Sequence, residues 1–186
     1  MECGAQTEFS RLRKVLMHRP NEELKRITPD NKNAYLFRDV VYWGAFQKEH
    51  DVYTDALRGE GVDIILLEDL LEERDRKTAA KLPNLVFTRD VCSVSDLGAL
   101  ILRMKYQARF PEPLIVSKAM EKLGIPVALK VKPPGLVEGG DFVYLDGVRL
   151  MMGFGTRSNE TGLMIIRDLM LNDAVEEFVA VPLPSF

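Results

Sequence analysis

Residues 142–152 read FVYLDGVRLMM, in which two apolar runs flank an Asp146-Gly147 pair. Asp-Gly between apolar runs is a strong short-range signal for a β-hairpin, because the tight turn that joins two strands favours these residues. The residues that follow predict a helix over 161–171 and a strand over 178–181. Together they predict one ββαβ module, in which a hairpin is followed by a helix and a third strand.

The same order of elements appears earlier in the chain. Residues 91–104 predict a hairpin, residues 113–123 a helix and residues 127–131 a strand. The two modules begin at Asp90 and Asp141, which lie 51 positions apart (141 − 90). A repeat of about 50 residues is typical of modules arranged around an axis. The repeat therefore predicts that the strand ends of successive modules meet at a common centre.

The N-terminal part of the chain has a related pattern. Residues 14–17 and 62–67 are short apolar runs that predict strands, and apolar residues recur at helical spacing over 43–57. Residues 21–38 are polar and predict a loop, and residues 70–82 predict a charged helix. The fold class is therefore α/β, with about three ββαβ modules around a pseudo-symmetry axis. The modules are expected at about residues 9–67, 84–131 and 138–181.

The composition excludes several classes of protein. With 25 basic and 28 acidic residues, the formal net charge is −3, which is too balanced to predict binding to nucleic acid or to a membrane surface. No apolar run approaches the ~20 residues of a membrane-spanning helix. Two cysteines are too few for a disulfide framework, so a cytoplasmic location is expected. No His/Cys cluster has ligand spacing, so neither a metal nor a cofactor is expected.

Polar residues at the predicted strand ends suggest a ligand. In each repeated module an Asp opens the first strand and an Arg follows the second: Asp90 with Arg109, and Asp141 with Arg157. A carboxylate binds a planar guanidinium through two charge-assisted hydrogen bonds, and an arginine binds a carboxylate in the same way. The set predicts a site for arginine or a related guanidino amino acid, with Asp90 at the guanidinium. The alternative is that these residues are solvated charges at strand ends.

Two neighbouring motifs extend this predicted site. Phe87 precedes Asp90 and either stacks on the guanidinium face or is an ordinary core aromatic residue. Glu138 precedes Gly139-Gly140, and such a glycine pair permits close backbone approach or unusual dihedral angles. Glu138 is therefore expected to hold a ligand or to orient a catalytic base, unless the motif is only a turn with surface acids.

These motifs resemble the arginine deiminase and amidinotransferase superfamily of guanidino-group-modifying enzymes, which share the pentein fold. The resemblance covers essentially the whole chain and follows four motifs in order, beginning with FTRD at residues 87–90. It implies a partial pentein α/β-propeller over residues 1–186, a single incomplete domain without its C-terminal modules. From the residues and the resemblance together, the expected catalytic residues are Glu138 and Asp90, and the expected substrate-binding residues are Asn84, Phe87, Asp90, Arg109, Asp141 and Arg157.

The resemblance implies nucleophilic chemistry. A cysteine thiolate attacks the guanidinium carbon, and a histidine acts as general acid and then activates water, so that arginine gives citrulline and ammonia. Transfer to an amine would instead make the protein an amidinotransferase, and penteins also include non-catalytic ligand-binding members. The family's histidine and cysteine motifs follow the region matched here. The chain alone is therefore expected to be inactive.

Two further expectations concern assembly and the cysteine within the matched region. An open partial ring would expose strand edges, so the chain is expected to associate with another copy or with a second chain. Cys92 lies two positions after Asp90 and would face the same side of a continuous strand. Buried cysteines are usually inert, so Cys92 is expected to be a core residue. His18 and His50 are expected to be structural or solvated.

Overall fold

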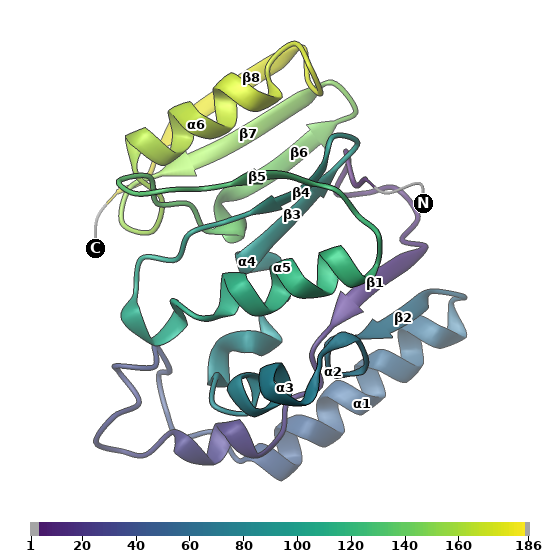
Figure 1. Cartoon of the computed structure of the whole chain (residues 1–186), viewed down its shortest axis with the longest axis vertical. Helices are drawn as coiled ribbons and strands as arrows, with labels where there is room; N and C mark the ends of the chain where they lie inside the picture. The colour runs from purple at the N-terminus through teal and green to yellow at the C-terminus, as the bar shows by residue number, and fades with distance from the viewer. Residues whose placement is uncertain (1–3, 185–186) are drawn as a thin grey trace. The chain divides into compact units, whose positions relative to one another are not determined.

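The computed structural model describes residues 4–184 and has a mixed α/β architecture (Figure 1). These residues divide into two compact units. The 89–184 unit also contains residues 4–10, and the 11–88 unit contains the residues between them. Within the described residues, no helix is both long enough and apolar enough to cross a membrane.

The 11–88 unit is built on a parallel strand pair. β1 (Lys14–Met17) pairs with β2 (Asp63–Leu66), and α1 (Trp43–Gly59) connects the two strands and packs on β2. These elements confirm the predicted strands and helix. Between β1 and α1 the described chain forms no strand, because it turns at Arg19-Pro20, where proline lacks a backbone donor, and enters the short helix η1 (Glu22–Arg26). This unit is therefore βαβ rather than the expected ββαβ.

Of the predicted charged helix over residues 70–82, the structure forms a shorter helix over residues 73–79, after a one-turn helix that shares only Leu70 with the predicted range. α2 (Leu67–Leu70) and α3 (Glu73–Ala79) are separated by Leu71, whose extended backbone (φ −90°, ψ 141°) interrupts the helical hydrogen bonds. Leu71 is buried, so the break lets its side chain enter the core of the unit. The short helix η2 (Pro83–Val86) follows α3.

The 89–184 unit repeats one arrangement twice. β3 (Cys92–Ser95) and β4 (Gly98–Ile101) form a hairpin, α5 (Glu112–Lys122) follows, and β5 (Val127–Lys130) pairs parallel to β4. The second sheet has the same order, with an antiparallel hairpin and a parallel third strand (Figure 1). It consists of β6 (Phe142–Asp146), β7 (Arg149–Phe154) and β8 (Glu177–Pro182), with α6 (Glu160–Met170) before β8. The predicted ββαβ order is confirmed in both modules.

The Asp146-Gly147 hairpin is confirmed, but its turn is held in a different way from the one that the sequence suggests. Asp146 Oδ1 accepts the backbone N–H groups of Val148 and Arg149, which closes the turn through a side chain. In the other hairpin, the left-handed backbone is found at Gly98, with a φ of 121°. Aspartate therefore contributes more to the β6–β7 turn than glycine does.

Buried residues of the 89–184 unit alternate with more exposed ones along its strands, as expected for a sheet with one face in the core. Phe142 and Tyr144 on β6, and Leu150 and Met152 on β7, alternate with more exposed residues and are almost fully buried. α6 packs against β7 and β8 and adds Ile166 to the same cluster. The buried cluster consists of Leu100, Leu102, Val131, Val137, Phe142, Tyr144, Leu150, Met152, Leu163, Ile166, Met170 and Val175.

The structure corrects the expected placement of two aspartates. Asp90 is expected to open a strand, but it lies in the one-turn helix α4 (Thr88–Val91), and Asp141 ends the short helix η4 (Gly139–Asp141). Aspartate favours such turns because its short side chain competes for nearby backbone hydrogen bonds. Since β3 begins only at Cys92, Asp90 and Cys92 do not share a strand.

Candidate functional site

Arg109 gathers two acids in the 89–184 unit. It ends the short helix η3 (Gln107–Arg109), and its side chain is 3% exposed. Its Nη1 donates to Asp90 Oδ2 at 2.7 Å, and its Nε and Nη2 both lie 2.9 Å from Glu112 Oε2. Glu112 is the first residue of α5 and is fully buried. One guanidinium therefore fixes two carboxylates that come from different elements.

Burial makes Glu112 a weaker acid than an exposed glutamate. Removal from water raises the pKa of Glu112 to about 7, although the positive charge of Arg109 opposes the rise. Its Oε1 is buried and has no hydrogen-bond partner among residues 4–184. Glu112 is not among the residues expected from the sequence. No sequence signal marks this pair, because an acid in the first turn of a helix is common and is usually explained by the helix dipole.

Glu138 forms a second ion pair. Its Oε2 accepts a hydrogen bond from Arg157 Nη1 at 2.8 Å, and its Oε1 lies 3.3 Å from the backbone nitrogen of Lys105, which donates to it. The Glu138 side chain is 6% exposed, whereas that of Arg157 is 38% exposed. The Arg157 guanidinium also lies over the ring of Tyr106, 4.8 Å from its centroid. Arg157 is therefore held by a buried acid and an aromatic ring, with part of its surface open to solvent.

Ser158 connects Asp141 to the backbone of Glu138. Its hydroxyl donates to Asp141 Oδ2 at 2.5 Å and accepts the Glu138 N–H at 3.0 Å. Partial burial raises the pKa of Asp141, and the hydrogen bond from Ser158 opposes this rise. The next residue, Asn159, caps α6 by accepting the N–H of Gly162 at 2.8 Å. Ser158 is thus a further residue of the site, outside the set that the sequence predicts to bind substrate.

The glycine pair lets two acid motifs approach each other. A Cβ atom at Gly139 would lie 1.9 Å from the carbonyl oxygen of Arg89, and one at Gly140 would lie 3.3 Å from Asp90 Oδ1. Position 139 therefore accepts only a glycine without a shift of the backbone. The expected close backbone approach is confirmed, and the Glu138 loop packs directly on the residues that carry Asp90.

Arg89 ties an N-terminal residue to the same region. Its Nη1 and Nη2 donate to the two carboxylate oxygens of Glu8 at 2.8 and 2.7 Å, and Nη2 also donates to the Phe142 carbonyl at 3.0 Å. The hydrogen bonds from Arg89 hold the pKa of Glu8 below its usual value, against the effect of burial. Glu8 Oε1 also accepts the Tyr144 N–H at 3.2 Å. The backbone immediately before Asp90 is thus anchored to β6.

Two of the expected substrate-binding residues belong to the 11–88 unit. Asn84 is buried, and its Nδ2 donates to the carbonyl of Tyr35 at 2.9 Å. Phe87 is 46% exposed, which does not fit an ordinary core aromatic residue. Contact of Asn84 and Phe87 with a substrate stays a prediction.

The surroundings of Cys92, His18 and His50 bear on whether any of them could act as a nucleophile or an acid. Burial raises the pKa of the Cys92 thiol to about 12, so almost no reactive thiolate is present at neutral pH. This environment agrees with the expected core role of Cys92. His18 lies in the 11–88 unit between Glu23 and Glu68 and is buried. Partial burial lowers the pKa of His50.

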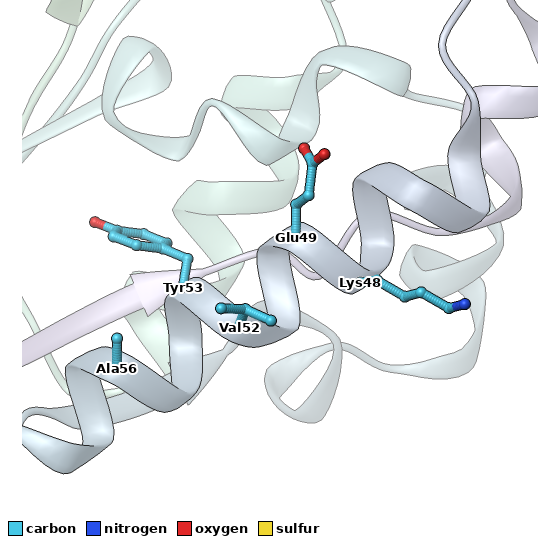
Figure 2. A pocket seen from close by; sticks show the side chains of 5 residues that line it. All are labelled: Lys48, Glu49, Val52, Tyr53 and Ala56. Atoms are coloured by element: carbon cyan, nitrogen blue, oxygen red, sulfur yellow. The ribbon is translucent and has the colours of Figure 1, made fainter.

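A pocket in the 11–88 unit does not coincide with the paired acids and arginines described above. It lies along α1 and is lined by Lys48, Glu49, Val52, Tyr53 and Ala56 (Figure 2). All its lining residues come from one helix, and none is an expected site residue. Within residues 4–184, no group of three or more His, Cys, Asp or Glu side chains is arranged to hold a metal ion. The acid–arginine cluster, which comprises Asp90, Arg109, Glu112, Glu138, Asp141 and Arg157, is the stronger candidate site.

Comparison with known families accounts for most of the chain. A sequence model described as arginine deiminase matches residues 33–81 and 75–186. The chain belongs to the arginine deiminase family. This finding confirms the superfamily that the sequence motifs resemble, and the acid–arginine cluster lies within the part that matches the arginine deiminase model.

Arginine deiminases from several bacteria are similar in sequence. The enzyme from Rhodococcus erythropolis (strain PR4 / NBRC 100887) is 33% identical over 145 residues, which cover 75% of this chain and 36% of the relative. The enzyme from Staphylococcus haemolyticus (strain JCSC1435) is 25% identical over 256 residues, covering 96% of this chain and 62% of the relative. The chain thus spans less than two thirds of the length of these arginine deiminases.

Solved structures outside the arginine deiminases share the fold. Dimethylarginine dimethylaminohydrolase (DDAH) from Pseudomonas aeruginosa, a cysteine-to-serine mutant complexed with citrulline, superposes with a TM-score of 0.72 at 21% identity, over 94% of this chain and 62% of that chain. The product-bound N-terminal domain of ArgZ, a cyanobacterial arginine dihydrolase, gives a TM-score of 0.70 at 16% identity, over 94% of this chain and 59% of that chain. At these identities the likeness establishes a common fold for this arginine deiminase family member.

Proposed function

We propose that this chain is the substrate-binding part of an arginine deiminase-type enzyme, which hydrolyses arginine to citrulline and ammonia. The observation that carries the proposal is the acid–arginine cluster, in which Asp90 and Glu138 each pair with an arginine of the chain itself. Each acid thus already binds a guanidinium of the chain itself, which supports the proposal that a substrate guanidinium can bind there. Membership of the arginine deiminase family supports the same substrate class.

The proposal gives the residues of the cluster different roles. Asp90 and Glu138 take the substrate guanidinium, and Arg157 takes the α-carboxylate. Arg109 is expected from the sequence to bind the carboxylate too, but its burial and its bonds to Asp90 and Glu112 favour a positioning role. Asn84, Phe87 and Asp141 are proposed as further substrate contacts.

The chemistry proposed for the whole enzyme needs a thiolate. The thiolate attacks the guanidinium carbon, ammonia leaves, and water then releases citrulline from the covalent intermediate. Cys92 is the free cysteine of the described residues, and its buried thiol, with a pKa of about 12, does not suit this role. We therefore propose that the 186-residue chain binds a guanidino substrate without turning it over.

A non-catalytic ligand-binding protein is the second candidate function. The high pKa of the Cys92 thiol favours it, because binding residues without a thiolate are what such a protein would retain. An amidinotransferase would use the same binding residues and differ in the acceptor, an amine in place of water. No contact in the acid–arginine cluster favours that acceptor.

The proposed assembly completes an open fold. We propose one incomplete domain over residues 1–186, a partial α/β-propeller of about three modules at residues 9–67, 84–131 and 138–181. The repeated strand order of the second and third modules supports this arrangement. A second copy or another chain is proposed to cover the remaining edges, in the cytoplasm.

Calorimetric titration with L-arginine tests the proposed site. Asp90→Asn removes the charge of one acid, and losing a charge-assisted hydrogen bond worth about 1.5–3 kcal/mol should weaken L-arginine binding roughly ten- to a hundredfold. Asp146→Asn is the matched control, because the Asp146 side chain is 29% exposed against 30% for Asp90 and also pairs with an arginine. It should leave the affinity unchanged.

Two results would contradict the proposal. Equal affinities of the Asp90→Asn and Asp146→Asn variants, with both folded by circular dichroism, would remove Asp90 from the site. Citrulline formation by the wild-type chain, if abolished by Cys92→Ser, would show that Cys92 is a nucleophile after all. We expect no citrulline above background.

A further inference from the structure

The two arginines of the acid–arginine cluster differ in their freedom to move. The Arg109 side chain is 3% exposed and binds Asp90 and Glu112 at once. If Arg109 moved away, both acids would lose a buried partner. The Arg157 side chain is 38% exposed and donates to Glu138 through Nη1. Arg157 can therefore swing towards solvent, whereas Arg109 is fixed.

The buried Glu138 carboxylate is stable only while it is paired with a cation. Its side chain is 6% exposed, and its Oε1 already accepts the backbone N–H of Lys105. Leaving a buried carboxylate without its partner is much less favourable than breaking an exposed pair. A ligand that reaches Glu138 must therefore bring a cationic group that takes the place of Arg157.

After such a replacement Arg157 has lost its carboxylate partner and can bind another anion. The Tyr106 ring, 4.8 Å away, supports the guanidinium but does not neutralise its charge. In L-arginine the carboxylate and the guanidinium lie at opposite ends of a three-methylene chain. The carboxylate can receive Arg157 when it leaves Glu138, and a decarboxylated analogue offers no such group.

We propose that the Glu138–Arg157 pair is a latch, which opens by ion-pair exchange and selects zwitterionic guanidino compounds over purely cationic ones. The ligand guanidinium replaces Arg157 on Glu138, and the ligand carboxylate receives the released Arg157. The latch rests on the proposed function, because that proposal assigns the guanidinium to Glu138. Tyr106 is a positioning residue that keeps Arg157 within reach of either anion.

Titration of the full 186-residue chain with L-arginine and with agmatine, its decarboxylated analogue, tests the latch. The wild type should bind L-arginine at least about tenfold more tightly than agmatine. Arg157→Leu should weaken L-arginine about tenfold or more and tighten agmatine severalfold, because Glu138 then has no competing guanidinium. Arg167→Leu is the control, since the Arg167 side chain is 41% exposed and pairs with Asp168. It should change neither affinity.

The outcomes separate the latch from the function on which it rests. Loss of both affinities in a folded Arg157→Leu chain would show a merely structural role and overturn the latch, as would equal wild-type affinities for the two ligands. Failure of the wild type to bind L-arginine would overturn the proposed function, and the latch with it. Tyr106→Phe should keep the preference for L-arginine and Tyr106→Leu should reduce it, because phenylalanine retains the ring face. Equal preferences in these two variants would remove Tyr106 from the latch.

Discussion

His18 carries a charge inside the 11–88 unit. Its Nε2 lies 3.2 Å from Glu23 Oε1, and its Nδ1 lies 3.6 Å from Glu68 Oε2. Burial alone would lower the pKa of His18, but the Glu23 hydrogen bond and the charges of Glu23 and Glu68 outweigh it and raise the pKa to about 9. The folded form at neutral pH therefore holds an imidazolium that joins the residue after β1 to η1 and α2.

The 11–88 unit should lose stability as the pH rises past neutrality. Because the folded pKa of His18 lies above its ordinary value of 6.5, the stabilisation is complete below about pH 6.5 and is lost as the pH rises through 9. A shift of this size corresponds to on the order of 3 kcal/mol in the free energy of unfolding. Urea unfolding across this pH range measures it, and His18→Gln should flatten the slope.

His50→Gln is the control for the His18 experiment. Partial burial lowers the pKa of His50, so its titration falls outside the window in which His18 loses its proton. The loss of stability between about pH 6.5 and 9 should therefore persist in His50→Gln. A wild-type chain whose stability is flat over that window would show that His18 is not charged in the folded state.

Residue type and spacing were enough to pick out part of the acid–arginine cluster. Asp90 and Glu138 could be selected because each stands in a distinctive motif before a predicted hairpin. Glu112 could not, because an acid in the first turn of a helix is common and is usually explained by the helix dipole. Tyr106 could not either, since its role depends on the distance to Arg157 in the folded chain.

Elements with strong local patterns were predicted best. The β6–β7 hairpin and α6 follow the alternation and helical spacing of their apolar residues, so their existence and order were correct. The helix break at Leu71 was missed because it depends on tertiary packing. It occurs where the Leu71 side chain is buried in the core, and the sequence does not show which leucine is buried. The helical turn around Asp90 was missed because one turn is too short to leave a periodic pattern.

The contact between η4 and the backbone before Asp90 should be sensitive to a single methyl group. Gly139→Ala places a Cβ 1.9 Å from the Arg89 carbonyl oxygen, so the backbone must shift and stability should fall by about 1–3 kcal/mol. The L-arginine affinity should fall as well. Gly147→Ala is the control, because a Cβ there meets nothing within 4 Å. Urea unfolding of both variants checks this, and equal stabilities would contradict the close approach.

The molecule as a whole leaves a strand edge unpaired. In the sheet order β6-β7-β8, β8 pairs with β7 on one side, and within the described residues its other side has no strand partner. Exposed edges favour pairing with another chain. The module count and the completed ring could not be settled from sequence patterns, because they depend on contacts beyond each repeated unit.

Self-association should therefore increase with concentration. Sedimentation equilibrium should give a mass above 21.1 kDa that rises with loading, and Ala180→Lys on the exposed part of β8 should lower it. Ala56→Lys, at an exposed alanine of α1, is the control and should have no effect. A stable monomer at every concentration would contradict the proposed association.

The Glu8–Arg89 pair has a consequence for the order in which the protein is made. Glu8 and Arg89 are 81 positions apart. Glu8 therefore has no Arg89 to pair with until the ribosome has added these 81 residues. At roughly 5–20 residues per second this delay is several seconds, longer than most local folding events. Residues 4–10 must therefore stay available during synthesis of the whole 11–88 unit. A nascent chain stalled before Arg89 would leave Glu8 exposed, even if the 11–88 unit had already folded.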